Sequence, residues 1–191
     1  AAQKALELDN TLAEGHAILG WIAFWYEWNW VAAENHFRQA LKFDPNDAES
    51  HLGYAHFLSN TGRHREALAE VKRSRELNPL HLLGNALEGL FLIQAGRLDE
   101  AQLSLHKTLA LDARFWLTHL YFSALYFEQG RFAEALDSAT QAETFSGGNS
   151  MSKAVSGIAL VNLGKAKEAR AILKELLQAS TQRYIPPYHF A

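Results

Sequence analysis

The nine histidines are the side chains with the greatest chemical potential in this sequence, because an imidazole can bind a metal ion or exchange a proton near neutral pH. Two of them, His16 and His51, occupy equivalent places in neighbouring segments and could therefore lie near each other. Metal-binding spacings are missing, since the chain has no His-Glu-x-x-His motif, no histidine pair four residues apart and no cysteine. We expect no metal and no cofactor, while a pH-sensitive packing role for these histidines stays open.

The sequence also has no recognisable arrangement of catalytic residues. The Ser, His and Asp residues are scattered, no glycine-rich phosphate loop follows a strand, and no pair of carboxylates is set apart in an apolar stretch. We therefore predict that the protein is not an enzyme.

Composition narrows the classes of partner. The chain has 18 basic and 21 acidic residues, and its net charge of −3 argues against direct binding to nucleic acid or to an anionic membrane. No apolar run is long enough to span a bilayer, and the absence of cysteine excludes disulfides. We expect a cytoplasmic protein whose partners are proteins or peptides.

A fixed period organises the elements that would hold any site. Several residue types recur every 34 residues: Gly62, Gly96, Gly130 and Gly164; Ala67, Ala101, Ala135 and Ala169; Glu66, Glu100, Glu134 and Glu168. A period of this length is typical of stacked supersecondary units rather than of one closed core. Each unit reads as two helices, with the periodic glycine between them in the left-handed cap conformation that lacks a Cβ clash.

The period divides the chain into one solenoid domain of successive units. We predict the second helix of a truncated repeat, five repeats and the start of a further helix, in the ranges 1–10, 13–47, 48–81, 82–115, 116–149, 150–180 and 184–191. Both ends thus look like interrupted repeats, as expected for a fragment of a longer chain. The small residue Gly20 and its equivalents should let paired helices approach closely, and the first unit has one extra residue in the turn 27–30, which lacks glycine.

These units resemble the tetratricopeptide repeat, which pairs two antiparallel helices over 34 residues. The matching positions include Leu19, Gly20, Ala40, Pro45 and Gly62 and their equivalents. The resemblance implies an all-α fold, a right-handed α-solenoid whose first helices line the concave face. The family's usual aromatic residue near the start of each first helix is replaced here by His16, His51, Asn85, His119 and Lys153.

The same resemblance implies a non-catalytic scaffold that binds a peptide or a partner helix in an apolar concave groove. The residues expected to line this groove are Trp21, Phe24, Trp25, Leu52, His56, Asn60, Leu90, Ile93, Gln94, Leu120, Phe127 and Glu128. The alternative for any of them is burial between neighbouring helices, or coverage by a terminal repeat that is missing from this sequence.

Two other functions remain open. Apolar edges could pair between chains, which would make this a self-association module and a homodimer. A narrower resemblance, at residues 27–34 and 183–188, is to tetratricopeptide segments that follow effector domains in bacterial signalling proteins. That resemblance implies a sensory segment that regulates an attached effector domain in cis.

Overall fold

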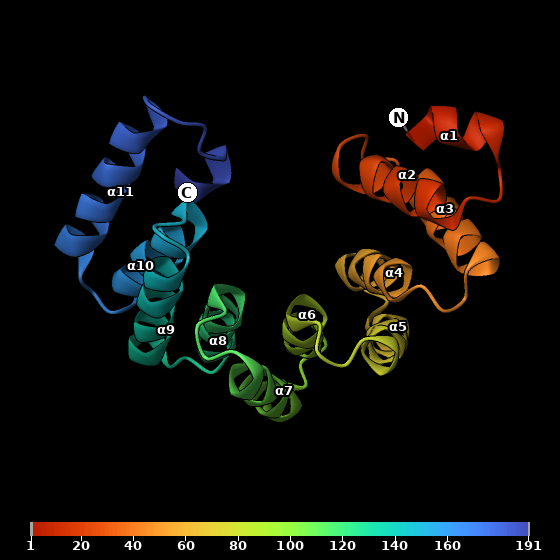
Figure 1. The fold of residues 1–191 in the computed structure, drawn as a ribbon. Helices are drawn as coiled ribbons and strands as arrows, with labels where there is room; N and C mark the ends of the chain where they lie inside the picture. Colours follow the sequence, from red (N-terminus) through yellow and green to blue (C-terminus); the bar gives the residue numbers. More distant parts are fainter. Residues whose placement is uncertain (1, 191) are drawn as a thin grey trace. The chain divides into compact units, whose positions relative to one another are not determined.

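The computed structural model describes residues 2–190, and the regular elements within that range are all helical (Figure 1). Residues up to Arg97 form one compact unit and residues from Leu98 form a second, and each is described by itself below. Unit 1 contains α1 (Ala2–Leu8), α2 (Ala13–Trp25), α3 (Trp30–Phe43), α4 (Ala48–Asn60), α5 (His64–Leu77) and α6 (Leu82–Gln94). Unit 2 contains α7 (Leu98–Leu111), α8 (Trp116–Glu128), α9 (Phe132–Phe145), α10 (Ser150–Asn162), α11 (Ala166–Ser180) and a 3-10 helix, η1 (Pro187–Phe190).

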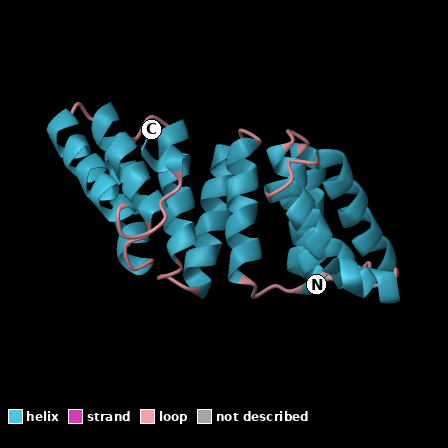
Figure 2. Cartoon of the chain, turned by 90° about the horizontal axis from the view of Figure 1, so that it is seen from above, coloured by secondary structure: helices cyan, strands magenta, loops and turns pink. Residues whose placement is uncertain are grey.

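Within each unit, consecutive helices pack side by side and short loops join them at their ends (Figure 2). The largest contact surfaces lie within the pairs α2–α3, α4–α5 and α8–α9, and each pair also packs against the next helix along the chain. Contacts of this kind join segments that are close in sequence, which is the property that defines a repeat solenoid. The predicted all-α repeat architecture is confirmed.

Phe37 is the centre of the core in unit 1. Its ring is fully buried, and it fits against two helices at the places where glycine leaves room. A Cβ atom added at Gly20 would lie 3.0 Å from this ring, and one added at Gly53 would lie 2.9 Å from it. The predicted close approach at Gly20 is therefore confirmed, and Gly53 serves the neighbouring helix in the same way.

In the core of unit 2, alanine and serine residues allow the paired helices to approach closely. Ala135, Ala139 and Ala142 are fully buried on one face of α9. Across from them, the Ser123 hydroxyl on α8 donates a hydrogen bond of 2.8 Å to the Ala135 carbonyl. A larger residue at either position would push the two helices apart.

The turns between paired helices have the left-handed backbone that the sequence predicts. Gly62, Gly96, Gly130 and Gly164 have φ angles of 81°, 72°, 70° and 74°. The turn of the first pair has no glycine, and there Trp28 adopts the same region with φ 55°. A bulky side chain in this conformation is a steric exception.

A shared hydrogen bond explains the missing aromatic residues near the starts of the first helices. In four of the five positions the side chain donates to the carbonyl six residues earlier, in the turn that enters the helix: His16 to Asn10 at 3.0 Å, His51 to Pro45 at 3.1 Å, Asn85 to Pro79 at 2.9 Å and His119 to Ala113 at 2.8 Å. An unsubstituted phenyl ring could not supply the donor. At these four positions, a hydrogen bond that closes the turn takes the place of the apolar contact made by the family's usual aromatic residue.

The C-terminal segment folds back on its own unit. Between residues 184 and 190 the structure has η1, which packs on α10 and α11. His189 is buried, and its Nδ1 lies 3.1 Å from the Ser150 hydroxyl. The sequence-predicted ranges 1–10 and 184–191 each include one residue, Ala1 and Ala191, that lies outside the described part of the chain.

Two glycine substitutions in unit 2 should change stability in opposite directions. Gly130→Ala places a Cβ in open space but at φ 70°, so backbone strain alone should lower the free energy of unfolding by about 1 kcal/mol. Gly157 lies inside α10, where an added Cβ would make an ordinary 3.6 Å contact with Ile172. Gly157→Ala should raise stability by about 0.5–1 kcal/mol through helix propensity.

Urea unfolding of the wild type and both variants, followed by circular dichroism, measures these two effects. Equal changes of the same sign would contradict the assignment of Gly130 to a strained turn and of Gly157 to a helix interior.

Candidate protein-binding surface

Five rings from three first helices meet in unit 1, and we call them the aromatic cluster: Trp21, Phe24, Trp25, His56 and Phe91. The His56 ring is their common neighbour, with centroid distances of 5.6 Å to Trp21, 5.5 Å to Trp25 and 5.8 Å to Phe91. Trp21 and Trp25 lie one turn apart on α2, so both point toward α4. Both also meet the His56 ring edge to face, which is a favoured geometry for aromatic pairs.

The His56 side chain is neutral at physiological pH. Burial lowers its pKa to about 4, because the surrounding rings cannot solvate an imidazolium. Its ring nitrogens have no hydrogen-bond partner among residues 2–190, so the ring acts as a packing surface with a free polar edge. The cluster is thus apolar and uncharged, which suits hydrophobic rather than ionic recognition.

The sequence-predicted groove residues fall into three groups by exposure. Phe24, Leu52, Ile93 and Leu120 are buried; Trp21, His56, Leu90 and Phe127 are half-buried; Trp25, Asn60, Gln94 and Glu128 are exposed. Trp25 offers the largest accessible ring of the set, with 53% of its surface exposed.

The polar members of the predicted set are held by the chain itself. Gln94 accepts a hydrogen bond from the Ser59 hydroxyl through its side-chain oxygen, which ties α6 to α4. The Asn60 side chain donates to the carbonyl of His56 at 2.8 Å. These contacts orient both amides beside the aromatic cluster.

The predicted set is divided between the two units. Its members up to Gln94 belong to unit 1, where the structure gathers the aromatic ones. Leu120, Phe127 and Glu128 belong to α8 in unit 2, and there the Phe127 ring packs 5.8 Å from the Phe132 ring.

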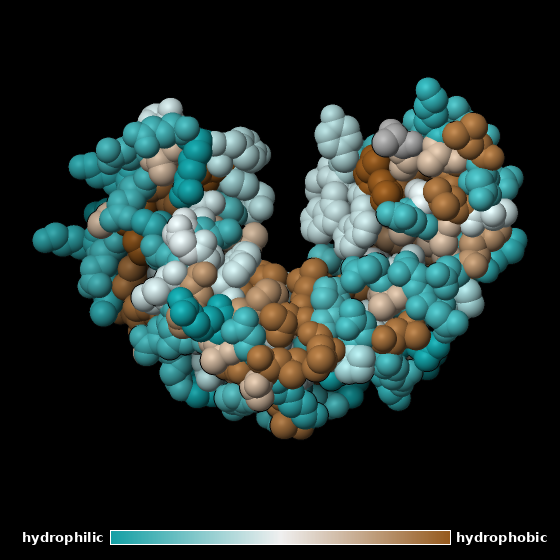
Figure 3. Space-filling model, in the orientation of Figure 1, coloured by the Kyte–Doolittle hydropathy of each residue, from teal (hydrophilic) through white to brown (hydrophobic). Residues whose placement is uncertain are grey.

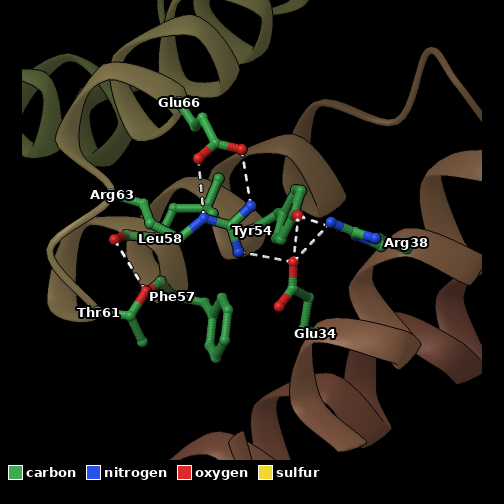
Figure 4. Close-up of polar contacts among 8 residues, drawn as sticks. All are labelled: Glu34, Arg38, Tyr54, Phe57, Leu58, Thr61, Arg63 and Glu66. Carbon is green, nitrogen blue, oxygen red and sulfur yellow. Dashed lines mark hydrogen bonds and ion pairs between the residues drawn. The ribbon is translucent and has the colours of Figure 1, made fainter. Parts of the chain in front are cut away.

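A polar network beside this surface locks α3 to α4 and to the start of α5 (Figure 4). One oxygen of Glu34 accepts hydrogen bonds from the Tyr54 hydroxyl at 3.0 Å and from Arg63 at 2.6 Å, and it lies 2.8 Å from Arg38. Arg63 also binds Glu66 through two nitrogens, at 2.8 and 2.7 Å. The sequence signals only the Arg63–Glu66 part, through the periodic Gly-Arg and Glu positions.

The network changes the acidity of its central carboxyl group. Partial burial raises the pKa of Glu34, but hydrogen bonds from Arg63 and Tyr54 and the charges of Arg63 and Arg38 outweigh it, so the net pKa is lowered. Glu34 is therefore an anion at neutral pH, and its charge stabilises the joint between the first two helix pairs.

The two histidines singled out by their equivalent positions have different partners. His16 Nδ1 lies 3.1 Å from His36 Nδ1, whereas His51 Nδ1 lies 2.6 Å from a carboxylate oxygen of Glu70. Burial and the neighbouring His16 lower the pKa of His36. Burial also lowers the pKa of His51, but the hydrogen bonds to Glu70 and Pro45 and the charge of Glu70 together outweigh it, so the net pKa is raised. Within residues 2–190, no group of three or more His, Cys, Asp or Glu side chains is arranged to hold a metal.

Sequence reasoning missed an exposed aromatic stretch next to the cluster. Tyr26, Trp28 and Trp30 lie in and after the turn from α2 to α3 and expose most or half of their surface. In Figure 3 this end of unit 1 shows pale atoms, since the hydropathy scale rates Trp and Tyr near its middle. The signals in the sequence were the extra residue in the turn 27–30 and the narrower resemblance at residues 27–34.

The fold places the chain among α-solenoids of paired helices, and residues 27–88 match the family model described as tetratricopeptide repeat. Residues 27–88 are thus similar in sequence to the tetratricopeptide repeat, and the fold of the described residues is the one that solved tetratricopeptide repeat structures share.

Solved structures share this fold at low sequence identity. The type IV pilus biogenesis factor PilW is 20% identical, with a TM-score of 0.78 over 96% of this chain and 84% of that chain. YrrB, described as a TPR protein with an unusual peptide-binding site, is 16% identical, with a TM-score of 0.59 over 91% of this chain and 89% of its own.

A curated relative matches a short stretch only. The human protein O-mannosyl-transferase TMTC1 is 35% identical over 52 residues, which is 27% of this chain and 6% of that protein. None of the helices within residues 2–190 has the length and apolar character of a membrane span.

Removing the charge of Glu34 should weaken unit 1. Glu34→Gln leaves Arg63 and Tyr54 without their anionic acceptor and should lower the free energy of unfolding by about 1–3 kcal/mol at pH 7. The folded-state pKa of Glu34 lies below its ordinary value of 4.5. The stabilisation is therefore complete above that value, and it is lost as the pH falls through the folded-state pKa.

Urea unfolding at several pH values between 7 and 3 tests this, with the exposed Glu168→Gln as the matched control. The control should shift stability by less than about 0.5 kcal/mol. A gap between wild type and Glu34→Gln that stays constant down to pH 3 would rule out the proposed ionic role.

Proposed function

We propose that this protein is a non-catalytic protein–protein interaction scaffold that binds a peptide or a partner helix through the aromatic cluster of unit 1. The observation that carries the proposal is the exposed ring of Trp25, which lies 4.8 Å from Phe24 and 5.5 Å from His56. An exposed tryptophan supported from below by other rings is typical of the anchor positions that dominate protein interfaces.

The rings of the aromatic cluster are held in place by packing within the free protein. Phe24 is buried and packs edge to face on Phe57, which fixes the base on which Trp25 lies. A rigid ring loses little conformational entropy on binding, so more of the hydrophobic gain appears as affinity. Covering apolar surface contributes about 25 cal/mol per Å². A peptide with one or two large apolar side chains therefore fits this surface.

Polar side chains beside the aromatic cluster would orient a bound segment. Asn60 and Gln94 are exposed beside it, each held by one internal hydrogen bond. Their remaining amide groups suit the backbone of a bound segment. The peptide-binding site described for YrrB supports a peptide as the class of partner.

We extend the proposal to the remaining predicted groove residues. Within unit 2, Leu120, Phe127 and Glu128 of α8 would provide a partner contact of their own. We also propose the ranges 13–47, 48–81, 82–115, 116–149 and 150–180 as the individual repeats. The transferase activity in the name of TMTC1 belongs to that protein, and our proposal for this chain includes no reaction.

Truncating Trp25 should remove most of the affinity for a selected peptide. Peptides would be selected from a displayed random library against the intact chain, and the tightest would be synthesised. We expect Trp25→Ala to weaken its binding at least tenfold, which corresponds to about 1.4 kcal/mol. Leu103→Ala, at a 58% exposed position on α7, is the matched control and should change binding less than twofold.

Isothermal titration calorimetry of the wild type and both variants measures the affinities, and light scattering of the free protein across concentration accompanies it. Equal affinity for Trp25→Ala and wild type would exclude the aromatic cluster as the site. A concentration-dependent dimer that Trp25→Ala abolishes would assign the cluster to self-association instead.

A further inference from the structure

The turn between α2 and α3 carries a second surface that the aromatic cluster does not use. We call it the tryptophan turn and define it as Tyr26, Glu27, Trp28, Trp30 and Val31. Its four apolar side chains are between 50% and 84% exposed. A contiguous exposed group of this kind is unusual on a protein surface unless a partner covers it.

The backbone of this turn holds its central tryptophan against a steric preference. Trp28 has φ 55°, the left-handed region that disfavours large side chains. The corresponding turns use glycine, as at Gly62, Gly130 and Gly164. Glycine would satisfy the fold here too, so the indole of Trp28 adds something that the turn geometry does not require. Strained residues of this type cluster at binding sites.

The charge within the turn is negative and uncompensated. Glu27 is the only ionisable carboxyl or basic side chain between Trp25 and Val31. Its electrostatic neighbour is His36 on α3. The nearby His36 does not neutralise it, because burial and the neighbouring His16 lower the pKa of His36 despite the opposing effect of Glu27. One exposed carboxylate therefore belongs to the same turn as the exposed indole and phenol rings.

Three other rings of this chain have one of its own cations nearby. Lys42 lies 5.6 Å from the Phe43 ring, Arg114 lies 5.6 Å from Phe145, and Arg131 lies 4.4 Å from Tyr126. No lysine or arginine among residues 2–190 covers the rings of the tryptophan turn in this way. The turn thus offers both halves of an arginine site, a flat aromatic face and a carboxylate, with neither half used internally.

We propose that the tryptophan turn docks an extended segment of a partner protein that carries arginine. The guanidinium group would stack on an indole and donate hydrogen bonds to Glu27, while its alkyl stem covers Val31 or Tyr26. Arginine suits this better than lysine, because its planar head stacks on rings and still donates hydrogen bonds at its edge. An anionic lipid surface fits poorly, because the only charge in the turn is a carboxylate.

The test uses the intact chain labelled with ¹⁵N and follows the indole N–H signals of its five tryptophans. The probe is the peptide acetyl-Gly-Arg-Arg-Gly-amide, and the matched probe replaces arginine by its uncharged isostere citrulline. We expect the Trp28 and Trp30 signals to move saturably with the arginine peptide, while Trp116 in unit 2 stays in place. The citrulline peptide should bind at least tenfold more weakly.

Three variants separate this surface from the aromatic cluster. Glu27→Gln should weaken the arginine peptide at least fivefold, whereas Glu14→Gln, an exposed carboxylate at the start of α2, should leave the affinity unchanged. Trp28→Gly restores the residue type of the other turns, so the fold should persist while the shift of the Trp30 signal is lost. Trp25→Ala should leave binding of the arginine peptide within twofold, whatever it does to an apolar peptide.

Several results would overturn the proposal. Equal binding of the arginine and citrulline peptides, or of Glu27→Gln and wild type, would exclude charge recognition. Movement of the Trp28 and Trp30 signals with protein concentration alone would assign the surface to a second copy of the chain. A response to phosphatidylcholine vesicles but not to the arginine peptide would assign it to lipid.

Discussion

The insertion of Phe37 between two glycines is the contact on which the rest of unit 1 depends. Its ring occupies the space that Gly20 and Gly53 leave free on neighbouring first helices, at distances that exclude even a methyl group. Trp21 then packs edge to face on the same ring, with a centroid distance of 5.6 Å. The contact that sets the spacing of the helices therefore also fixes the first ring of the aromatic cluster. In such a fold the aromatic cluster cannot be adjusted independently of the core.

The polar contacts also join elements that are neighbours in the sequence. The Glu34 network joins α3 to α4 and to the residue before α5, and the histidine or asparagine near the start of a first helix closes the turn before it. All of these bonds join neighbouring elements. Each joint is thus stabilised by its own small set of contacts, and a change at one joint should leave distant ones intact.

Much of the fold could be predicted from the sequence because the restraints are local and periodic. The glycines at 34-residue intervals mark left-handed turns, and Gly20 marks a close helix crossing, since both depend on the residue at that position alone. The conformation of Trp28 could not be predicted, because nothing in the residue type suggests a positive φ. The sequence shows that this turn has one extra residue, but it does not show which residue of the turn takes the positive φ angle.

The site was predictable only in part, because groove residues were chosen by helix position and not by contact. Position alone cannot distinguish Phe24, which is buried, from Trp25, which packs against it and is exposed. It also could not reveal that His56 is the common neighbour of the rings, since that depends on three helices meeting. The partners His36 and Glu70 were missed for the same reason, as they face His16 and His51 from a second helix.

The most direct test of the binding surface is to locate a bound peptide by photo-crosslinking. A library-selected peptide would carry a benzophenone side chain at its main apolar position, and mass spectrometry would identify the residues it modifies in the intact chain. We predict modification within α2 near Trp21 and Trp25 and within α4 near His56. Crosslinks confined to the second helices, such as α5 or α11, would contradict the assignment of the aromatic cluster as the binding surface.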